Sequence, residues 1–162
     1  MPETVDVRSQ TVSMWASATD TAHDSVDDAG TPVSYPADNV LDGDPATAWR
    51  APGDGNGVTL EVTFATPVVL TEVGLIPGYA KLDPSTGYDR FPQNRRIVSA
   101  LWEFSDGSSA AQTFDDAPTM QRVPVNALTD WARITILETT VDGGRDFTPI
   151  SDIGLWGYVE EF

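Results

Sequence analysis

The chain has 162 residues and no cysteine, and its 25 Asp and Glu residues against 9 Lys and Arg residues give a formal net charge of −16 at pH 7. Disulfides and thiolate metal sites are therefore excluded. The negative charge disfavours nucleic acid and anionic membrane surfaces as partners, because both repel an acidic protein.

The length is enough to bury one continuous hydrophobic core, so we expect a single domain over residues 1–162. The polar residues 1–10 lack the apolar region of a signal peptide, and we expect them to form a flexible N-terminal segment. No stretch approaches the roughly 20 apolar residues of a membrane helix, so we expect no direct membrane insertion by this chain.

Apolar and polar residues alternate in short stretches separated by Gly, Pro, Asp and Asn, which indicates β-strands. In residues 58–64, for example, Val58, Leu60 and Val62 alternate with Thr and Glu, so one face is buried and the other is solvated. In chain order we expect strands at 11–18, 58–64, 68–76, 97–104, 110–114, 121–125, 131–139 and 150–157.

The connections complete this prediction. Residues 19–36 are polar and acidic and are expected to form a long loop, and Asp106-Gly107 is typical of a hairpin turn. About eight short strands without a convincing amphipathic helix favour two packed antiparallel sheets. The predicted fold is therefore all-β, an antiparallel β-sandwich of the jelly-roll type.

Residues 39–50 read Asn-Val-Leu-Asp-Gly-Asp-Pro-Ala-Thr-Ala-Trp-Arg. The form N-x-x-D-G-D-x-x-T-x-W soon after the first strand resembles discoidin domains, also called factor V/VIII type C domains. This resemblance implies a galactose-binding-like jelly roll.

The same stretch is rich in hard oxygen ligands, and a glycine in its centre allows a tight turn, so the loop can wrap a calcium ion. The resemblance also implies a contribution from an acidic residue on the last strand, where this chain has an Asp in place of the usual Glu. The alternative is an ordinary acidic turn whose carboxylates accept hydrogen bonds from nearby backbone N–H groups. The candidate ligands of a structural calcium are Val40, through its backbone, Asp42, Asp44, Thr47 and Asp152.

Residues 77–96 contain four of the nine cations together with three aromatic residues. With residues 47–55, they resemble the glycan-binding subgroup named after the translocation domain of streptococcal NAD glycohydrolase, which is common on actinobacterial surface proteins. Aromatic rings pack on the C–H faces of sugars, and Arg and Asn bind hydroxyls. The candidate ligand-binding residues are Arg50, Tyr79, Lys81, Tyr88, Arg90, Asn94 and Arg95.

The alternative for residues 77–96 is a loop that folds back on itself. In that case Arg90, Arg95 and Arg96 pair with Asp83 and Asp89. Phe91 and Tyr88 are then buried, because long ordered loops need internal packing.

Catalysis is disfavoured, because the chain has no Cys and its single His, His23, lies in an acidic loop without a nucleophile motif. Zinc is disfavoured for the same reason. We predict a non-catalytic carbohydrate-binding module that binds glycan, monomeric when isolated, and an extracellular or cell-surface part of a larger exported or membrane-anchored bacterial protein. The alternatives are a protein-binding or scaffolding ectodomain and, less favoured, a small glycoside hydrolase using paired carboxylates.

Overall fold

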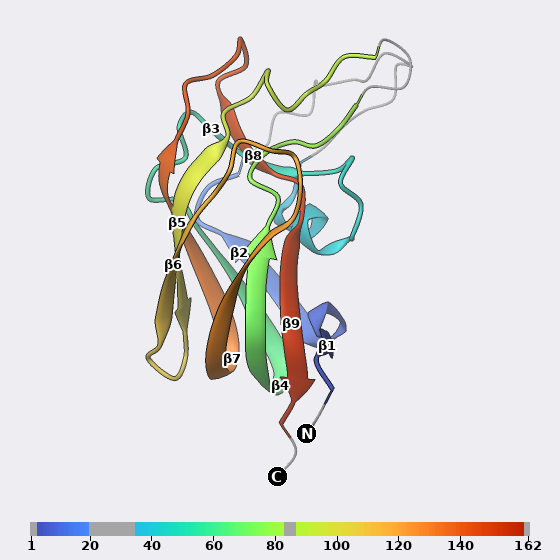
Figure 1. Cartoon of the computed structure of the whole chain (residues 1–162), viewed down its shortest axis with the longest axis vertical. Coiled ribbons are helices and arrows are strands. Elements are labelled where there is room, and N and C mark those ends of the chain that lie inside the picture. Colours follow the sequence, from blue (N-terminus) through green and yellow to red (C-terminus); the bar gives the residue numbers. More distant parts are fainter. Residues whose placement is uncertain (1–2, 20–34, 83–86, 161–162) are drawn as a thin grey trace.

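The computed structural model describes residues 3–19, 35–82 and 87–160 (Figure 1). Most of the predicted loop at 19–36 therefore lies outside the described residues, and so does Asp83. The described elements are β1 (Val5–Asp6), the 3₁₀ helix η1 (Arg8–Gln10), β2 (Thr11–Ala16), the 3₁₀ helix η2 (Ala37–Leu41), β3 (Trp49–Pro52), β4 (Thr59–Leu75), β5 (Ile97–Phe104), β6 (Ser109–Thr113), β7 (Gln121–Thr139), β8 (Phe147–Ile150) and β9 (Ile153–Val159).

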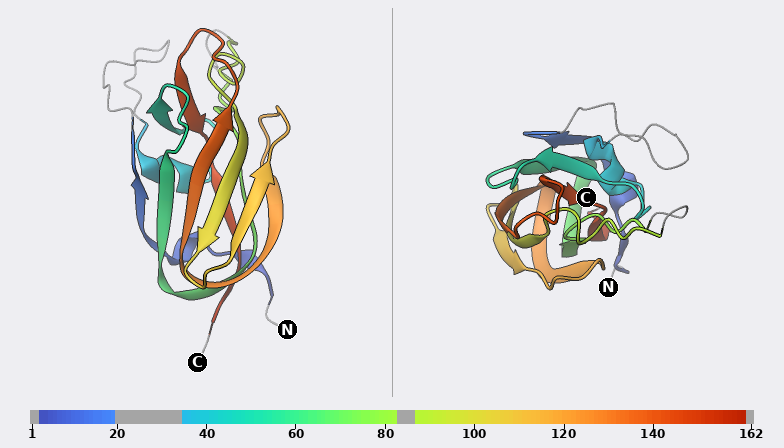
Figure 2. Two further views of the ribbon diagram at one scale, coloured as in Figure 1. Left: turned by 90° about the vertical axis from the view of Figure 1, so that its left-hand side faces the viewer. Right: turned by 90° about the horizontal axis from the view of Figure 1, so that it is seen from above.

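Two long strands, β4 and β7, run through both layers of an antiparallel sandwich. Residues 60–64 of β4 pair with β2, and residues 59–63 pair with residues 131–135 of β7. After a break in register, residues 68–75 pair with β9 and with residues 121–129 of β7. One layer therefore has the order β2-β4-β7-β5-β6 and the other the order β7-β4-β9-β1 (Figures 1 and 2).

The predicted all-β sandwich is confirmed, although its strands are divided differently. The predicted strands 58–64 and 68–76 form one bent strand, β4, because the backbone stays extended through the bend. The predicted strands 121–125 and 131–139 form one bent strand, β7, in the same way. The predicted strand at 150–157 is instead two, since β8 ends at Ile150 and β9 begins at Ile153.

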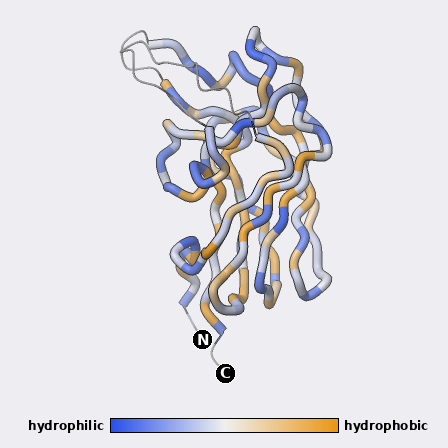
Figure 3. Tube along the Cα trace, turned by 180° about the vertical axis from the view of Figure 1, so that it is seen from behind, coloured by the Kyte–Doolittle hydropathy of each residue, from blue (hydrophilic) through white to orange (hydrophobic). Residues whose placement is uncertain are grey.

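The core lies between the two layers and follows the predicted alternation. Leu60 and Val62 point inward from the first half of β4, and Leu70 and Leu75 from the second half. Figure 3 shows this alternation as hydrophobic and hydrophilic bands along the strands. Each apolar side chain removed from water contributes roughly 1.5–3 kcal/mol to the stability of the fold.

The N-terminal segment, expected to be flexible, is paired with β9 from Val5 onward. Val5 and Asp6 pair with Gly157 and Trp156 of β9, and the backbone N–H of Val7 donates to the carbonyl of Leu155 at 3.0 Å. The side chain of Val7 is buried in the core, so an apolar anchor and a short ladder hold this segment in place.

The loops that concern function gather at the end of the sandwich away from the termini, which is called the loop end below (Figure 1). There β3 and β8 form a small two-stranded sheet in which Trp49 pairs with Ile150 and Pro52 with Phe147. Trp49 is fully buried and anchors this sheet to the core. Within the described residues, no helix is long and apolar enough to cross a membrane.

Candidate functional site

Arg50 lies between two aromatic rings at the base of the loop end. Strand β3 carries it, and the small sheet with β8 brings it beside Phe147. Its guanidinium carbon is 3.8 Å from the centroid of the Tyr35 ring and 3.8 Å from that of the Phe147 ring. Arg50 is only 2% exposed. Two cation–π contacts away from solvent hold this side chain in one position. Arg50 therefore packs beneath the loops as part of their support.

Tyr79 was predicted as a ligand platform, but it packs inside the loop end instead. It is 3% exposed, its ring meets Tyr35 edge to face at a centroid distance of 6.0 Å, and its hydroxyl donates to the carbonyl of Ala46 at 3.3 Å. Burial raises the pKa of the Tyr79 hydroxyl, although the guanidiniums of Arg90 and Arg50 oppose this shift. Tyr79 therefore links the loop of residues 77–96 to the turn at residues 42–47, which is called the acidic loop below.

Tyr88 is the predicted aromatic residue that does face solvent, with 58% of its surface exposed. Its loop turns back on itself, since Leu82 and Asp89 form an antiparallel bridge and the N–H of Arg90 donates to the carbonyl of Lys81 at 2.9 Å. The guanidinium carbon of Arg90 lies 6.0 Å from the Tyr88 ring centroid. The structure thus brings Lys81, Tyr88 and Arg90 together at the surface.

Asn94 and Arg95, the other two predicted ligand residues, hold this loop in place. Asn94 is 1% exposed and its amide donates to the carbonyl of Arg90 at 2.8 Å. Arg95 donates from Nε to Asp146 at 2.7 Å and from Nη1 to the carbonyl of Thr140 at 3.0 Å. Both side chains therefore bind other parts of the protein, as the alternative of a self-packed loop predicted.

The ion pairs of two of these arginines differ from that alternative. Arg95 pairs with Asp146 at 2.7 Å and Arg96 with Asp116 at 3.1 Å. Asp83 lies outside the described residues, so a pair between Arg90 and Asp83 stays a prediction. Phe91 is buried as the alternative required, whereas Tyr88 is not.

Three residues of this end were missed from the sequence: Tyr35, Phe147 and Arg145. The first two form the cage around Arg50. The backbone N–H of Arg145 donates to the carbonyl of Gln93 at 3.0 Å, and the side chain of Gln93 accepts from Arg90 at 3.0 Å, so Arg145 and Arg90 share a neighbour. No local pattern marks these residues. The pairing of β3 with β8 brings Phe147 beside Arg50, whereas Tyr35 and Arg145 lie outside both strands.

The acidic loop forms local hydrogen bonds. The carboxylate of Asp42 accepts from the N–H of Asp44 at 2.9 Å and from the hydroxyl of Thr47, and the carboxylate of Asp44 accepts from the N–H of Ala46 at 2.9 Å. Gly43, with a φ of 71°, makes the turn possible. Val40 is fully buried in the core. This is the arrangement of an ordinary capped acidic turn.

Asp152 lies between β8 and β9 and pairs with Arg8, whose Nη1 is 2.8 Å from its Oδ2. Burial raises the pKa of the Asp152 carboxyl, and the Arg8 guanidinium opposes the shift. Across the described residues, no three acidic or histidine side chains are arranged to hold a metal ion. Calcium therefore stays a prediction, and the side chains named for it do not fit a coordination shell as they are placed.

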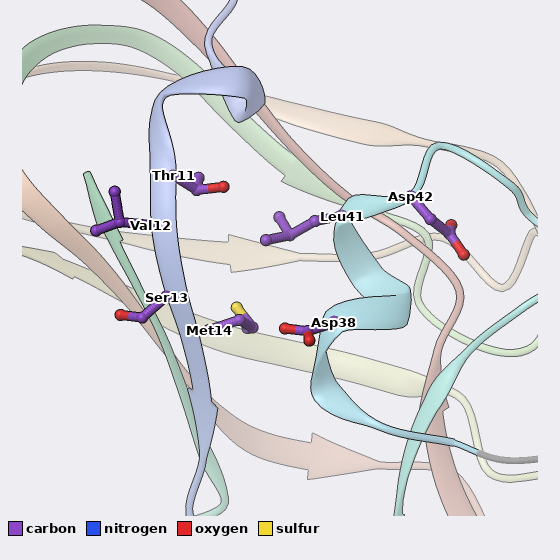
Figure 4. Close-up of a pocket in the computed structure, with 7 residues that line it drawn as sticks. All are labelled: Thr11, Val12, Ser13, Met14, Asp38, Leu41 and Asp42. Carbon is purple, nitrogen blue, oxygen red and sulfur yellow. The ribbon is translucent and has the colours of Figure 1, made fainter. Parts of the chain in front are cut away.

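A shallow groove of about 300 Å³ lies beside the acidic loop, between β2 and η2 (Figure 4). Asp38 and Leu41 point toward β2, whereas Asp42 points away from it. The residues lining the groove are Thr11, Val12, Ser13, Met14, Asp38, Leu41 and Asp42. Of the described residues that line the groove, none is aromatic, so none offers a ring on which a sugar would stack.

Comparison with solved structures places the fold among carbohydrate-binding modules. A family 32 module of Clostridium perfringens NanJ in complex with galactose matches with a TM-score of 0.63 and 13% identity, over 95% of this chain and 99% of that one. The module CBM32-3 from a family 31 glycoside hydrolase of C. perfringens gives 0.67 and 12%, over 95% and 94%. Chitosan-binding module 1 from a Paenibacillus sp. IK-5 chitosanase/glucanase gives 0.65 and 10%, over 94% and 99%.

No curated protein sequence matches the chain. The family model of the NAD glycohydrolase translocation F5/8 type C domain matches residues 10–155, which include both β-layers, the acidic loop and the loop end. The chain therefore belongs to the family of NAD glycohydrolase translocation F5/8 type C domains.

Proposed function

We propose that this domain is a non-catalytic carbohydrate-binding module that binds glycan at the loop end, with Tyr88 as its aromatic contact. The observation that carries the proposal is the exposed Tyr88 ring with Arg90 beside it. Asn94 and Arg95 hold their loop in place through hydrogen bonds to the Arg90 carbonyl and to Asp146. A rigid ring next to hydrogen-bond donors is the arrangement that sugar binding needs.

The similar solved structures support this proposal through the ligands they name. One was solved with galactose, and another is a chitosan-binding module. Their identity to this chain is low, so they indicate glycan as a ligand class and leave the individual sugar open.

The groups beside Tyr88 favour binding over hydrolysis. Arg90 supplies a guanidinium beside the Tyr88 ring, which suits hydroxyl recognition, and Lys81 and Gln93 belong to the same loop. A glycoside hydrolase requires a pair of carboxylic groups on either side of the scissile bond. We also propose that the domain acts outside the cell, as an ectodomain of a larger exported bacterial protein, and that it is monomeric when isolated.

A second candidate function is protein binding on the same surface. Leu82, which bridges to Asp89 beside Tyr88, is 64% exposed. An exposed leucine next to an exposed tyrosine is a feature of protein interfaces as well as of sugar sites.

A glycan array followed by calorimetry tests the proposal. We expect a saturable polysaccharide or oligosaccharide ligand whose affinity falls in Tyr88→Ala and is unchanged in the matched control Trp15→Ala. Trp15 is also exposed, at 56%, but lies on β2. A blank array with binding of a protein partner lost in Leu82→Ala supports the second function and contradicts the first.

A further inference from the structure

The carboxylate of Asp152 is buried, and a buried charge needs a compensating charge close by. Arg8 supplies it: Nη1 is 2.8 Å from Oδ2 of Asp152 and 3.4 Å from the carbonyl of Ile153. The other side of the same guanidinium binds Asp6, with Nε at 2.9 Å and Nη2 at 2.7 Å from Oδ2. One arginine therefore joins the N-terminal segment to the last strand of the sandwich.

The guanidinium also reaches the acidic loop. Its Nη2 lies 3.7 Å from the point where a Cβ on Gly43 would be placed, so the turn of the loop packs directly against it. A calcium ion shared by this loop and Asp152 would need six to eight oxygen ligands around this place. Instead, Nη1 of Arg8 binds Oδ2 of Asp152 there, while Oδ1 of Asp152 is buried without a hydrogen-bond partner among the described residues. The carboxylates of Asp42 and Asp44 accept hydrogen bonds from groups of their own loop.

Asp152 is connected to the loop end through its neighbour Ser151. The hydroxyl of Ser151 donates to the carbonyl of Pro45 at 2.9 Å and accepts from the N–H of Ala80 at 2.8 Å. The N–H of Ile76 donates to the carbonyl of Asp152 at 2.9 Å. The turn between β8 and β9 thus contacts both the acidic loop and the beginning of the loop that carries Tyr88.

We infer that Arg8 is the resident cation of this site, takes the place that the sequence suggested for calcium, and acts as a positioning residue for the loop end. It makes the stability of the domain independent of calcium. The role of Arg8 in positioning the loop end matters for binding only if the proposed function holds. Its role as the cation beside Asp152 does not depend on that function.

The test measures the thermal midpoint, Tm, of the whole chain with calcium at about 10 mM and with chelator, for the wild type, Arg8→Ala and Arg8→Lys. The Tm of the wild type is expected to be the same in both conditions, because a ligand stabilises only the state that binds it. Arg8→Ala is expected to lower Tm by about 5 °C or more in chelator. Calcium then restores part of this loss, since Asp6 and Asp152 no longer have a cation, and Arg8→Lys loses less than Arg8→Ala.

Arg122→Ala is the matched control, because Arg122 stacks on Trp156 with its guanidinium carbon 3.9 Å from the ring and lies on β7. It is expected to show no calcium response. A saturable rise of the wild-type Tm with calcium overturns the inference and needs no variant that folds. An Arg8→Ala protein with no calcium response, or with no larger loss than Arg122→Ala, overturns it as well. These readouts involve no glycan, so a failure here is distinct from a failure of the proposed function.

Discussion

Two arginines are held in different ways at two places in this domain. Arg8 is bound by the carboxylates of Asp6 and Asp152, whereas Arg50 is packed between the rings of Tyr35 and Phe147. The first arrangement balances charge and joins distant segments, and the second gives the loop end a rigid base. In a protein with few cations, an arginine is therefore not by itself a sign of ligand recognition, since its neighbours decide its role.

The largest effect is expected for Arg50→Ala. Losing two desolvated cation–π contacts costs roughly 2–3 kcal/mol, which lowers Tm by about 8 °C. Glycan binding should weaken too, because the loops lose their base. Arg50→Lys keeps the charge but not the planar group, so calorimetric unfolding should show it between the wild type and Arg50→Ala. An Arg50→Ala protein with wild-type Tm would mean that the aromatic cage contributes nothing.

Tyr88→Ala should give a smaller effect of another kind. Because the ring is exposed, the expected change in stability is within about 0.5 kcal/mol. Glycan affinity should fall by about tenfold, which corresponds to the roughly 0.5–1.5 kcal/mol of an aromatic contact. Titration calorimetry and a melting curve on the same sample separate these two quantities. A parallel loss of Tm and affinity would assign Tyr88 to packing.

Asn94→Ala, on the same loop as Tyr88, is expected to change stability rather than direct contact with the ligand. Its buried amide donates to the carbonyl of Arg90, so removing it should cost about 1 kcal/mol of stability and about 2–4 °C in Tm. Any loss of glycan affinity should recover on cooling, where the loop is ordered again. An unchanged Tm with abolished binding would show instead that Asn94 contacts the ligand.

The smallest effect is expected for Asp6→Asn, and it depends on pH. Burial alone would raise the pKa of Asp6, but the hydrogen bonds from Arg8 outweigh it, so the pKa lies below the usual 3.8. The stabilisation is therefore present above pH 3.8 and is lost as the pH falls through the folded-state pKa. The two proteins should differ by at most about 1 kcal/mol at neutral pH. Melting curves across this range should converge in acid; a constant difference would contradict the ion pair.

Much of the fold could be predicted from the sequence, because the alternation in residues such as Leu60 and Val62 is local. The continuity of β4 and β7 could not, since the apolar alternation is interrupted at residues 65–67 and 126–130 although each strand continues through them. The role of Arg8 was equally hidden. Its partner Asp152 is 144 residues away, and a polar segment gave no sign that Val7 would enter the core.

The candidate loops could be chosen from the sequence, but the exposure of each residue in them could not be predicted. The composition of residues 77–96 indicated a special loop, and the structure places Tyr88 and Arg90 at its surface. It could not show that Tyr79 and Asn94 would be buried, because exposure depends on how the loop packs against β3 and β8. The motif around Asp42 marks a real turn. Its link to calcium stays a prediction, which the inferred role of Arg8 opposes.

The most direct test of the central claim is calorimetric titration of the domain with the strongest ligand found on a glycan array, carried out side by side for the wild type, Tyr88→Ala and Trp15→Ala. We expect saturable binding that is about tenfold weaker in Tyr88→Ala and unchanged in Trp15→Ala. Equal affinity in all three proteins, or no glycan bound by the wild type, would contradict it.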